Sequence, residues 1–308
     1  MATVRTTQKR APFGERLAAA LARYKTPLCM GIDPHLPLLP AVFGAGTPKI
    51  GDTKTIAAIR SFALSAIDIA AGRLPAIKPQ AAFFEQHGPE GMMVLAEIAA
   101  YARSKDLLVI MDAKRGDIGS TSAAYAEAFL GLDAPFQSDA LTINAYMGTD
   151  TLMPFMEAAD ASGNGLFVLV RTSNPGSADL QEQIIDGKPL YQRLAEKLAP
   201  LSQRLQDKDN WSSLGIVAGA TWPDEARQLR SILPASPFLI PGYGAQGAPA
   251  SDALASLSRD TGCWQGGLVN ASRGLTFPKA AADLSDMHSW QTAILDQLEG
   301  MVVDLNAA

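Results

Sequence analysis

Residues 107–121, LLVIMDAKRGDIGST, join an uninterrupted aliphatic run to a dense group of charges. Aliphatic runs of this kind are typical of strands that are buried on both faces, as in parallel sheets. The run ends at Asp112, and three more charged residues follow within five positions. The segment therefore predicts a parallel strand whose carboxyl end carries a cluster of ionised side chains.

Similar apolar runs recur along the chain, and most precede a segment with helical spacing, such as 53–71 with its apolar face of Ile56, Ile59 and Ala63. This alternation favours a (β/α)8 barrel, the TIM barrel, with an extra helix over 11–25 before the first strand. A six-stranded open sheet is the alternative. The expected strands are 27–32, 74–78, 107–112, 140–144, 166–171, 214–220, 237–242 and 266–271, and the expected helices are 53–71, 90–104, 120–131, 150–160, 188–206, 223–233, 250–258 and 287–304.

The composition of the 308 residues is that of a globular protein, with 47% hydrophobic and 19% charged residues, which excludes a disordered chain. No linker divides the chain into two domains. We therefore expect a flexible N-terminus over 1–10 and a single catalytic barrel domain over 11–308. The polar stretch 174–188 is expected to form a long loop after the fifth strand.

The net charge of −5 argues against nucleic acid and anionic lipid as partners. No run approaches the roughly 18 apolar residues of a membrane span, and the N-terminus lacks the apolar core of a signal peptide, so we expect a cytoplasmic protein. The two cysteines, Cys29 and Cys263, lie in apolar stretches and offer no disulfide framework. No metal site is expected.

In a barrel, catalytic side chains lie at the carboxyl ends of the strands. Asp112 and Lys114 are two residues apart, so they are expected to project to the same side of their strand, with Asp117 on the turn beyond. Alternating Asp and Lys lowers the cost of burying each charge and suits a lysine that acts as an acid toward a developing carbanion. A solvated loop salt bridge is the alternative, but Lys78 at the end of another strand favours a functional site.

The stretch GYGAQG (242–247) matches the GxGxxG pattern but follows the expected seventh strand rather than the first. In barrels, the loops after strands seven and eight often bind phosphate. The next loop, NASRG (270–274), adds the guanidinium of Arg273 and the backbone amide of Gly274. These loops predict a phosphate site, with a glycine-rich turn beside an incidental surface arginine as the alternative.

Taken together, these residues resemble the orotidine 5′-phosphate decarboxylase family in its longer bacterial-type form. DAKRGDIGST (112–121) resembles the catalytic Asp-x-Lys-x-x-Asp signature of that family. The resemblance covers nearly the whole chain and implies cofactor-free decarboxylation of orotidine 5′-monophosphate to uridine 5′-monophosphate (UMP) and CO2 in de novo pyrimidine synthesis. The other matching motifs are GIDP (31–34), IKPQAAFFEQHG (77–88), TINAYMG (142–148), RTSNPG (171–176), IPGYGAQG (240–247) and VNASRG (269–274).

The resemblance implies a role for each matching residue of the charged site. Asp33 and Lys78 would hold the ribose hydroxyls, and Lys78 would also belong to the charged network. Asp112 would lie against the substrate carboxylate. Lys114 would deliver the proton to C6.

The resemblance also implies a homodimer in which Asp117 and Thr121 come from the neighbouring subunit. Ser173 would read the pyrimidine edge. The phosphate would be bound by Gln246 and Arg273, with Tyr243 and Gly274 beside them.

Three other functions remain open from the residues. A magnesium-dependent sugar-phosphate decarboxylase or aldolase of the same barrel group would use the carboxylates around a metal, although the Ser173 loop favours the nucleotide. A non-catalytic nucleotide-binding barrel would bind UMP without turnover. A Schiff-base aldolase using Lys114 is disfavoured, because flanking carboxylates raise rather than lower the pKa of a lysine.

Overall fold

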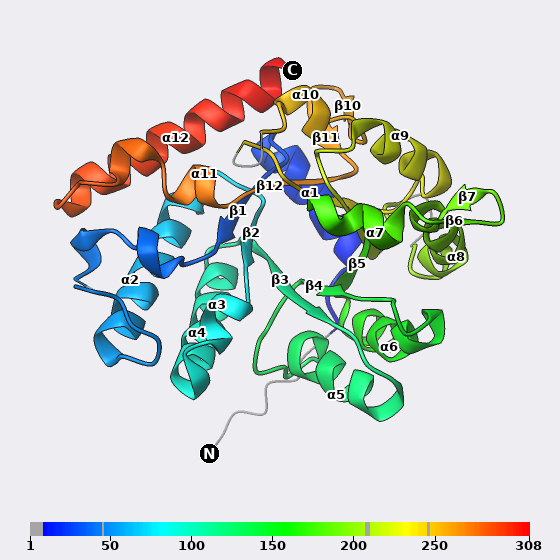
Figure 1. The fold of residues 1–308 in the computed structure, drawn as a ribbon, viewed down its shortest axis with the longest axis horizontal. Coiled ribbons are helices and arrows are strands. Elements are labelled where there is room, and N and C mark those ends of the chain that lie inside the picture. The colour runs from blue at the N-terminus through cyan, green and yellow to red at the C-terminus, as the bar shows by residue number, and fades with distance from the viewer. Residues whose placement is uncertain (1–8, 45, 207–209, 245–246) are drawn as a thin grey trace.

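The computed structural model describes residues 9–44, 46–206, 210–244 and 247–308. In this part of the chain, eight parallel strands close into a barrel that is surrounded by helices (Figure 1). Each strand overlaps one of the expected runs, so the predicted (β/α)8 barrel is confirmed. In their order around the barrel the strands are β1 (Leu28–Ile32), β12 (Gly267–Ala271), β9 (Phe238–Pro241), β8 (Leu214–Ala218), β5 (Gly165–Arg171), β4 (Ala140–Ile143), β3 (Leu108–Arg115) and β2 (Ala76–Pro79).

The helices bury their apolar faces against the outward-facing side chains of the strands, such as Ile77, Val109 and Ile216. Side-chain caps begin two of the longest helices: Asp52 accepts a hydrogen bond from Thr55 N (3.0 Å), and Asp286 accepts one from Ser289 N (2.8 Å). The helices are α1 (Phe13–Tyr24), α2 (Thr53–Ala70), α3 (Ala82–Glu85), α4 (Gly88–Ser104), α5 (Gly119–Leu130), α6 (Met153–Ser162), α7 (Ala178–Gln181), α8 (Leu190–Arg204), α9 (Pro223–Ile232), α10 (Ala250–Ala253), α11 (Arg273–Thr276) and α12 (Met287–Ala307). None of the helices in the described residues is long and apolar enough to cross a membrane.

The extra helix α1 closes the amino-terminal end of the barrel. Its buried face, Phe13, Leu17 and Leu21, packs into one cluster with inward-facing strand residues. The ring of Phe13 meets the ring of Phe167 edge-on, with 5.8 Å between centroids. Gly165 makes room for it, since a Cβ at that position would lie 2.3 Å from Phe13 Cδ1. Among the described residues, the barrel is therefore filled at this end.

Arginines flanking the start of α1 are held by a carboxylate that precedes β4. Asp139, whose side chain is 2% exposed, accepts hydrogen bonds from Arg10 Nη1 (2.6 Å), from Arg16 Nη1 and from Val109 N (2.8 Å). Burial alone would raise the pKa of Asp139, but Arg16, Arg10 and the Val109 amide together hold that pKa below its usual value. Asp139 is thus a buried, fully ionised anchor for the N-terminal helix.

Replacing Asp139 with asparagine should lower the free energy of unfolding by about 3 kcal/mol at pH 7, because two partly buried guanidinium groups lose their counter-charge. Since the folded pKa lies below the unfolded value of 3.8, this stabilisation is complete above about pH 5 and disappears as the pH falls through the folded pKa. Urea unfolding at pH 7 and pH 3 measures both effects. Asp160→Asn, which breaks an exposed pair with Lys9 (3.0 Å), is the control and should change stability by less than about 1 kcal/mol. Equal losses in the two variants would refute the anchoring role.

Two segments differ from expectation. The stretch 174–188, expected as a loop, contains a turn of 3-10 helix (Pro175–Ser177), α7, and an antiparallel hairpin of β6 (Ile184–Ile185) and β7 (Lys188–Pro189). That hairpin turns at Asp186 and Gly187, which both have positive φ, as an Asp-Gly turn requires.

The expected helix 250–258 is wrong in its second half. Helix α10 ends at Ala253, and the chain then forms a second hairpin, β10 (Ser258–Asp260) and β11 (Cys263–Gln265), which turns at Thr261 and Gly262. Both turn residues have positive φ, a conformation that reverses the direction of the chain in a tight turn. The predicted flexible segment 1–10 lies outside the described residues, except for residues 9 and 10.

Candidate active site

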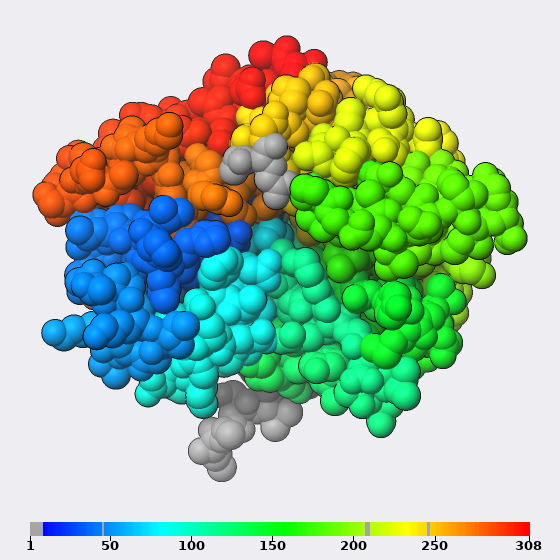
Figure 2. Space-filling model, in the orientation of Figure 1, coloured from blue at the N-terminus to red at the C-terminus, as the bar shows by residue number. Residues whose placement is uncertain are grey.

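The carboxyl ends of the barrel strands open into one cavity of about 540 Å³. In Figure 2 this face is hollowed near its centre, between the blue and cyan segments that follow β1 and β2 and the green segment that contains α7. A cavity of this volume accommodates a small-molecule ligand. Seven residues singled out in the sequence line it: Asp33, Lys78, Asp112, Lys114, Ser173, Tyr243 and Arg273.

Four of these side chains form a chain of alternating charge across three neighbouring strands. Lys78 Nζ donates to Asp112 Oδ2 (2.7 Å), and Lys114 Nζ donates to Asp112 Oδ1 (2.6 Å). Asp33 Oδ1 lies 4.0 Å from Lys78 Nζ. The predicted meeting of Asp112, Lys114 and Lys78 is therefore confirmed, and two ammonium groups hold both oxygens of one carboxylate.

The buried members of this array remain ionised. Burial alone would lower the pKa of Lys78, but Asp112 and Asp33 raise that pKa above its ordinary value. Burial alone would raise the pKa of Asp112, but Lys78 and Lys114 hold it well below its ordinary range. The Lys114 side chain, in contrast, is 45% exposed and faces the cavity. Within this array, Lys114 is thus the cation that a ligand can approach.

The backbone at Lys114 departs from a regular strand. The register between β3 and β4 shifts between Met111 and Arg115, and Lys114 has a φ of +50°. Its amide donates to Thr142 Oγ1 (2.9 Å), and the same hydroxyl donates to Asp112 Oδ1 (3.0 Å). A non-glycine residue at positive φ costs of order 1–3 kcal/mol and is found mainly at functional sites. Lys114 therefore reaches Asp112 through a bulge, and not through plain strand alternation.

Two polar partners of Asp112 were not identified from the sequence. One is Thr142 on β4, described above. The other is Gln80, whose Nε2 donates to Asp112 Oδ2 (2.9 Å). Gln80 lies two residues beyond Lys78, so the same alternation argument applied to β2 would have found it. Thr142 acts across strands, and its contact depends on a register that the sequence does not state.

The residues expected at the phosphate end differ in their surroundings. Arg273 begins α11 and faces the cavity, and Gly274 follows it but is not among the described lining residues. The hydroxyl of Tyr243 donates to Asp304 Oδ2 on α12 (2.6 Å), so a phosphate contact through that hydroxyl would have to replace this bond. Gln246 lies outside the described residues.

Asp117 and Thr121 stand apart from the described residues that line the cavity. Asp117 Oδ1 accepts a hydrogen bond from Ile118 N (2.7 Å), and Thr121 is exposed on α5. The neighbouring Ile118 is a large apolar side chain that is 62% exposed. Within one chain these residues lie beyond the carboxyl end of β3, in the connection to α5 and its first turn, and outside the cavity lining.

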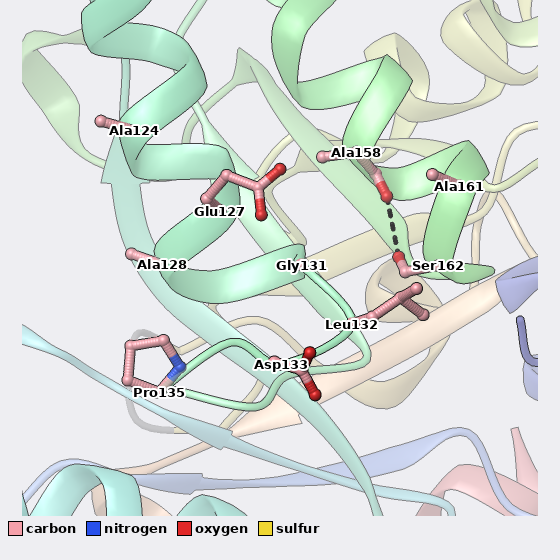
Figure 3. A pocket seen from close by; sticks show the side chains of 10 residues that line it. All are labelled: Ala124, Glu127, Ala128, Gly131, Leu132, Asp133, Pro135, Ala158, Ala161 and Ser162. Atoms are coloured by element: carbon pink, nitrogen blue, oxygen red, sulfur yellow. Dashed lines mark hydrogen bonds between the residues drawn. The ribbon is translucent and has the colours of Figure 1, made fainter. Parts of the chain in front are cut away.

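A second hollow lies between the carboxyl ends of α5 and α6 (Figure 3). Its described lining residues include the carboxylates Glu127 and Asp133 and no basic side chain. Ser162 in this hollow donates to Ala158 O within its own helix (2.8 Å). This hollow therefore lacks the cations that an anionic ligand needs.

The described residues offer little support for metal binding or for thiol chemistry. No group of three or more His, Cys, Asp or Glu side chains there is placed to hold a metal ion. Cys29 is fully buried, and burial raises the pKa of its thiol to about 12, so it is not a nucleophile.

Comparison with known proteins gives a consistent result. Residues 26–283 match the family model described as Orotidine 5′-phosphate decarboxylase / HUMPS family. Orotidine 5′-phosphate decarboxylase from Rhodopirellula baltica is 42% identical over 92% of this chain and 95% of that protein. The enzyme of the same name from Deinococcus radiodurans is 37% identical over 94% of this chain and 97% of that protein.

Solved structures of similar sequence share the fold. A candidate orotidine 5′-phosphate decarboxylase from Streptomyces avermitilis is 37% identical, with a TM-score of 0.79 over 100% of both chains. OMP decarboxylase from Leishmania donovani is 31% identical, with a TM-score of 0.72 over 96% of this chain and 99% of that one.

Proposed function

The chain belongs to the orotidine 5′-phosphate decarboxylase / HUMPS family, and we propose that it converts orotidine 5′-monophosphate to UMP and CO2 in pyrimidine synthesis. The observation that carries the proposal is the array of Asp33, Lys78, Asp112 and Lys114 in one strand-end cavity. The array offers one accessible ammonium group, Lys114, beside a carboxylate that is held ionised.

The main barrier to this reaction is the unstable carbanion that forms at C6 of the pyrimidine. When the C6–carboxylate bond breaks, CO2 leaves and the electron pair stays on C6 of the pyrimidine. In our proposal no cofactor delocalises this pair, so the protein must stabilise it electrostatically. Lys114 supplies the positive charge and then transfers a proton from Nζ to C6, which gives UMP and a neutral lysine that takes a proton back from water.

The rest of the array positions that lysine. Asp112 binds Lys114 Nζ on one oxygen and is fixed on the other by Lys78 and Gln80. An ionised Asp112 beside the substrate carboxylate also destabilises the bound substrate, which we rank second to stabilisation of the carbanion. The ribose hydroxyls bind to Asp33 and Lys78.

The remaining subsites bind the two ends of the nucleotide. Ser173 binds the pyrimidine edge, and the phosphate is held at Arg273 with Gln246, Tyr243 and Gly274. Binding energy from the distant phosphate organises the charged array for reaction at C6. The proposal includes a single catalytic domain over 11–308 and a cytoplasmic homodimer, with Asp117 and Thr121 contributed to the partner's site.

The test is the loss of orotidine 5′-monophosphate absorbance with purified protein that has been stripped with EDTA. We expect full turnover. Loss of activity that only magnesium restores would favour the metal-dependent sugar-phosphate enzyme. Tight UMP binding without turnover would favour the non-catalytic barrel.

Arg273→Ala should weaken capture of the phosphorylated substrate. Two charge-assisted hydrogen bonds at roughly 1.5–3 kcal/mol each correspond to a fall in kcat/KM of about 10²–10⁴-fold. If phosphate binding organises the site, phosphite dianion should raise turnover of the nucleoside orotidine by the wild type and much less by Arg273→Ala.

Two controls accompany the Arg273 prediction. Arg227→Ala removes an exposed arginine that pairs with Asp224 on α9, and it should leave kcat/KM unchanged. The nucleoside orotidine should be processed equally by wild type and Arg273→Ala. A loss for orotidine as large as that for the nucleotide would show that Arg273 does not bind the phosphate.

A further inference from the structure

The segment that carries Ser173 is fastened on three sides, and we propose that Trp222 and Gln181 are positioning residues that hold Ser173 against the pyrimidine. This inference rests on the proposed function, because it takes Ser173 as the residue that reads the base. It adds that the loop after β5 is set in its binding position before the nucleotide arrives, through a cluster centred on the buried Arg171.

Arg171 is the last residue of β5, and its side chain is 1% exposed. Its Nη1 donates to Ser177 Oγ (2.8 Å) and its Nη2 donates to Glu182 Oε1 (2.5 Å). These two partners lie on either side of α7. The guanidinium thus ties both ends of α7 to a barrel strand.

Trp222 connects this arginine to the backbone beside Ser173. The indole ring lies against the Arg171 guanidinium, 4.1 Å from its central carbon. The indole Nε1 donates to the carbonyl oxygen of Thr172 (3.0 Å). That carbonyl belongs to the peptide bond joining Thr172 to Ser173, so the indole fixes the plane from which Ser173 projects.

Gln181, the last residue of α7, also holds Thr172. Its Oε1 accepts a hydrogen bond from Thr172 N (2.9 Å), and its Nε2 donates to Thr172 Oγ1 (2.9 Å). Every polar group of Thr172 is therefore engaged, and both Thr172 and Gln181 line the active-site cavity. The residue before Ser173 cannot rotate without breaking these bonds.

The third support is a close approach to β8. Gly219, just beyond β8, donates its amide to Arg171 O (2.8 Å). A Cβ at Gly219 would lie 2.8 Å from Ser173 Cβ, so the Ser173 backbone rests directly on the end of that strand. The contact leaves no room for Ser173 to move away from the cavity toward β8.

A buried guanidinium is costly unless it is paired, and here its partners converge on one segment that lines the ligand cavity. A loop that is already in its binding conformation does not lose conformational freedom when the ligand binds. The cluster therefore contributes to nucleotide binding through the position that it gives to Ser173.

The test is a double-mutant cycle between Ser173→Ala and Trp222→Phe. Phenylalanine keeps an aromatic ring beside Arg171 and removes the N–H donor with part of the ring volume, and the Trp264→Phe control described below loses the same volume. We expect Trp222→Phe to lower kcat/KM for orotidine 5′-monophosphate and the affinity for UMP by about 10-fold, and to leave inhibition by ribose 5-phosphate unchanged. In the Ser173→Ala background the same change should have almost no effect, because Trp222 acts through Ser173.

Two further variants sharpen this test. Trp264→Phe is the matched control, since that indole donates to Asn306 Oδ1 (2.7 Å) away from the site, and it should leave the kinetics unchanged. Gln181→Met removes both bonds to Thr172 at nearly constant volume and should reproduce the pattern of Trp222→Phe. Amide hydrogen exchange across 172–183 should rise in both Trp222→Phe and Gln181→Met.

The outcomes separate this inference from the proposed function. Additive losses in the cycle, or unchanged kinetics and UMP affinity in Trp222→Phe, would overturn the positioning role while leaving decarboxylation intact. A Ser173→Ala variant with wild-type behaviour would overturn it as well. If wild-type protein shows no turnover, the proposed activity fails, and the cycle measured on UMP affinity still decides the role of Trp222.

Discussion

Replacing Lys114 with alanine should abolish decarboxylation of orotidine 5′-monophosphate and leave the barrel folded. In the proposed mechanism this side chain supplies both the charge that stabilises the carbanion and the proton that ends it. Removing a preorganised electrostatic group commonly costs 10²–10³-fold in rate, and loss of a general acid costs a further factor of about 10²–10⁴. We therefore expect a fall in kcat of at least about 10⁴-fold.

The fold should tolerate the change because Lys114 is at the mouth of the barrel and its side chain is 45% exposed. Asp112 keeps its bonds to Lys78, Gln80 and Thr142, so no buried carboxylate is left without a partner. Thermal unfolding and UMP binding measure whether fold and cavity survive.

Two variants complete the Lys114 experiment. Lys114→Arg retains a positive charge but cannot release a proton near neutral pH, so it should bind UMP and remain severely impaired. Lys105→Ala removes an exposed lysine that pairs with Asp68 (3.1 Å) and should be fully active. If Lys114→Ala retained activity within 10-fold of wild type, Lys114 would not be the proton donor.

The barrel could be predicted from the sequence because each strand is buried on both faces. A strand of this kind consists mainly of aliphatic residues, so it stands out as a short apolar run. The charged residues at the strand ends could be predicted as site residues for a similar reason. A charge such as Lys78 or Asp112 at the end of an apolar run has few structural explanations. The Asp-Gly pair at Asp186 and Gly187 is also a turn signal in the sequence, and it forms the turn of the hairpin inside the segment expected as a loop.

The contacts that could not be predicted from the sequence depend on strand register and on backbone strain. Thr142 meets Asp112 because β3 and β4 pair with Met111 opposite Leu141, and the positive φ of Lys114 belongs to the irregularity that follows this pairing. The bonds that hold Thr172 come from Gln181 and Trp222, which are distant in sequence or on another element. Such contacts follow from three-dimensional packing and leave no periodic signal.

The second large effect concerns Asp117, which stands outside the lining of its own cavity and next to the exposed apolar Ile118. In the proposed dimer each site combines Lys114 of one chain with Asp117 of the other. The Lys114→Ala and Asp117→Ala homodimers should therefore both be nearly inactive. A mixed dimer contains one site with both substitutions and one site with neither, so activity should appear when the two inactive proteins are combined.

The size of the recovery follows from random pairing in a two-fold assembly. Co-refolding equal amounts makes about half of the dimers mixed, and each mixed dimer has one intact site, so roughly a quarter of wild-type activity should return. The matched control combines Lys114→Ala with Asp112→Asn. Lys114 and Asp112 bind each other within one chain (2.6 Å), so every site in that mixture carries a defect and no activity should return. If mass spectrometry shows subunit exchange and the Lys114→Ala and Asp117→Ala mixture stays inactive, Asp117 serves its own chain and the shared-site dimer is wrong.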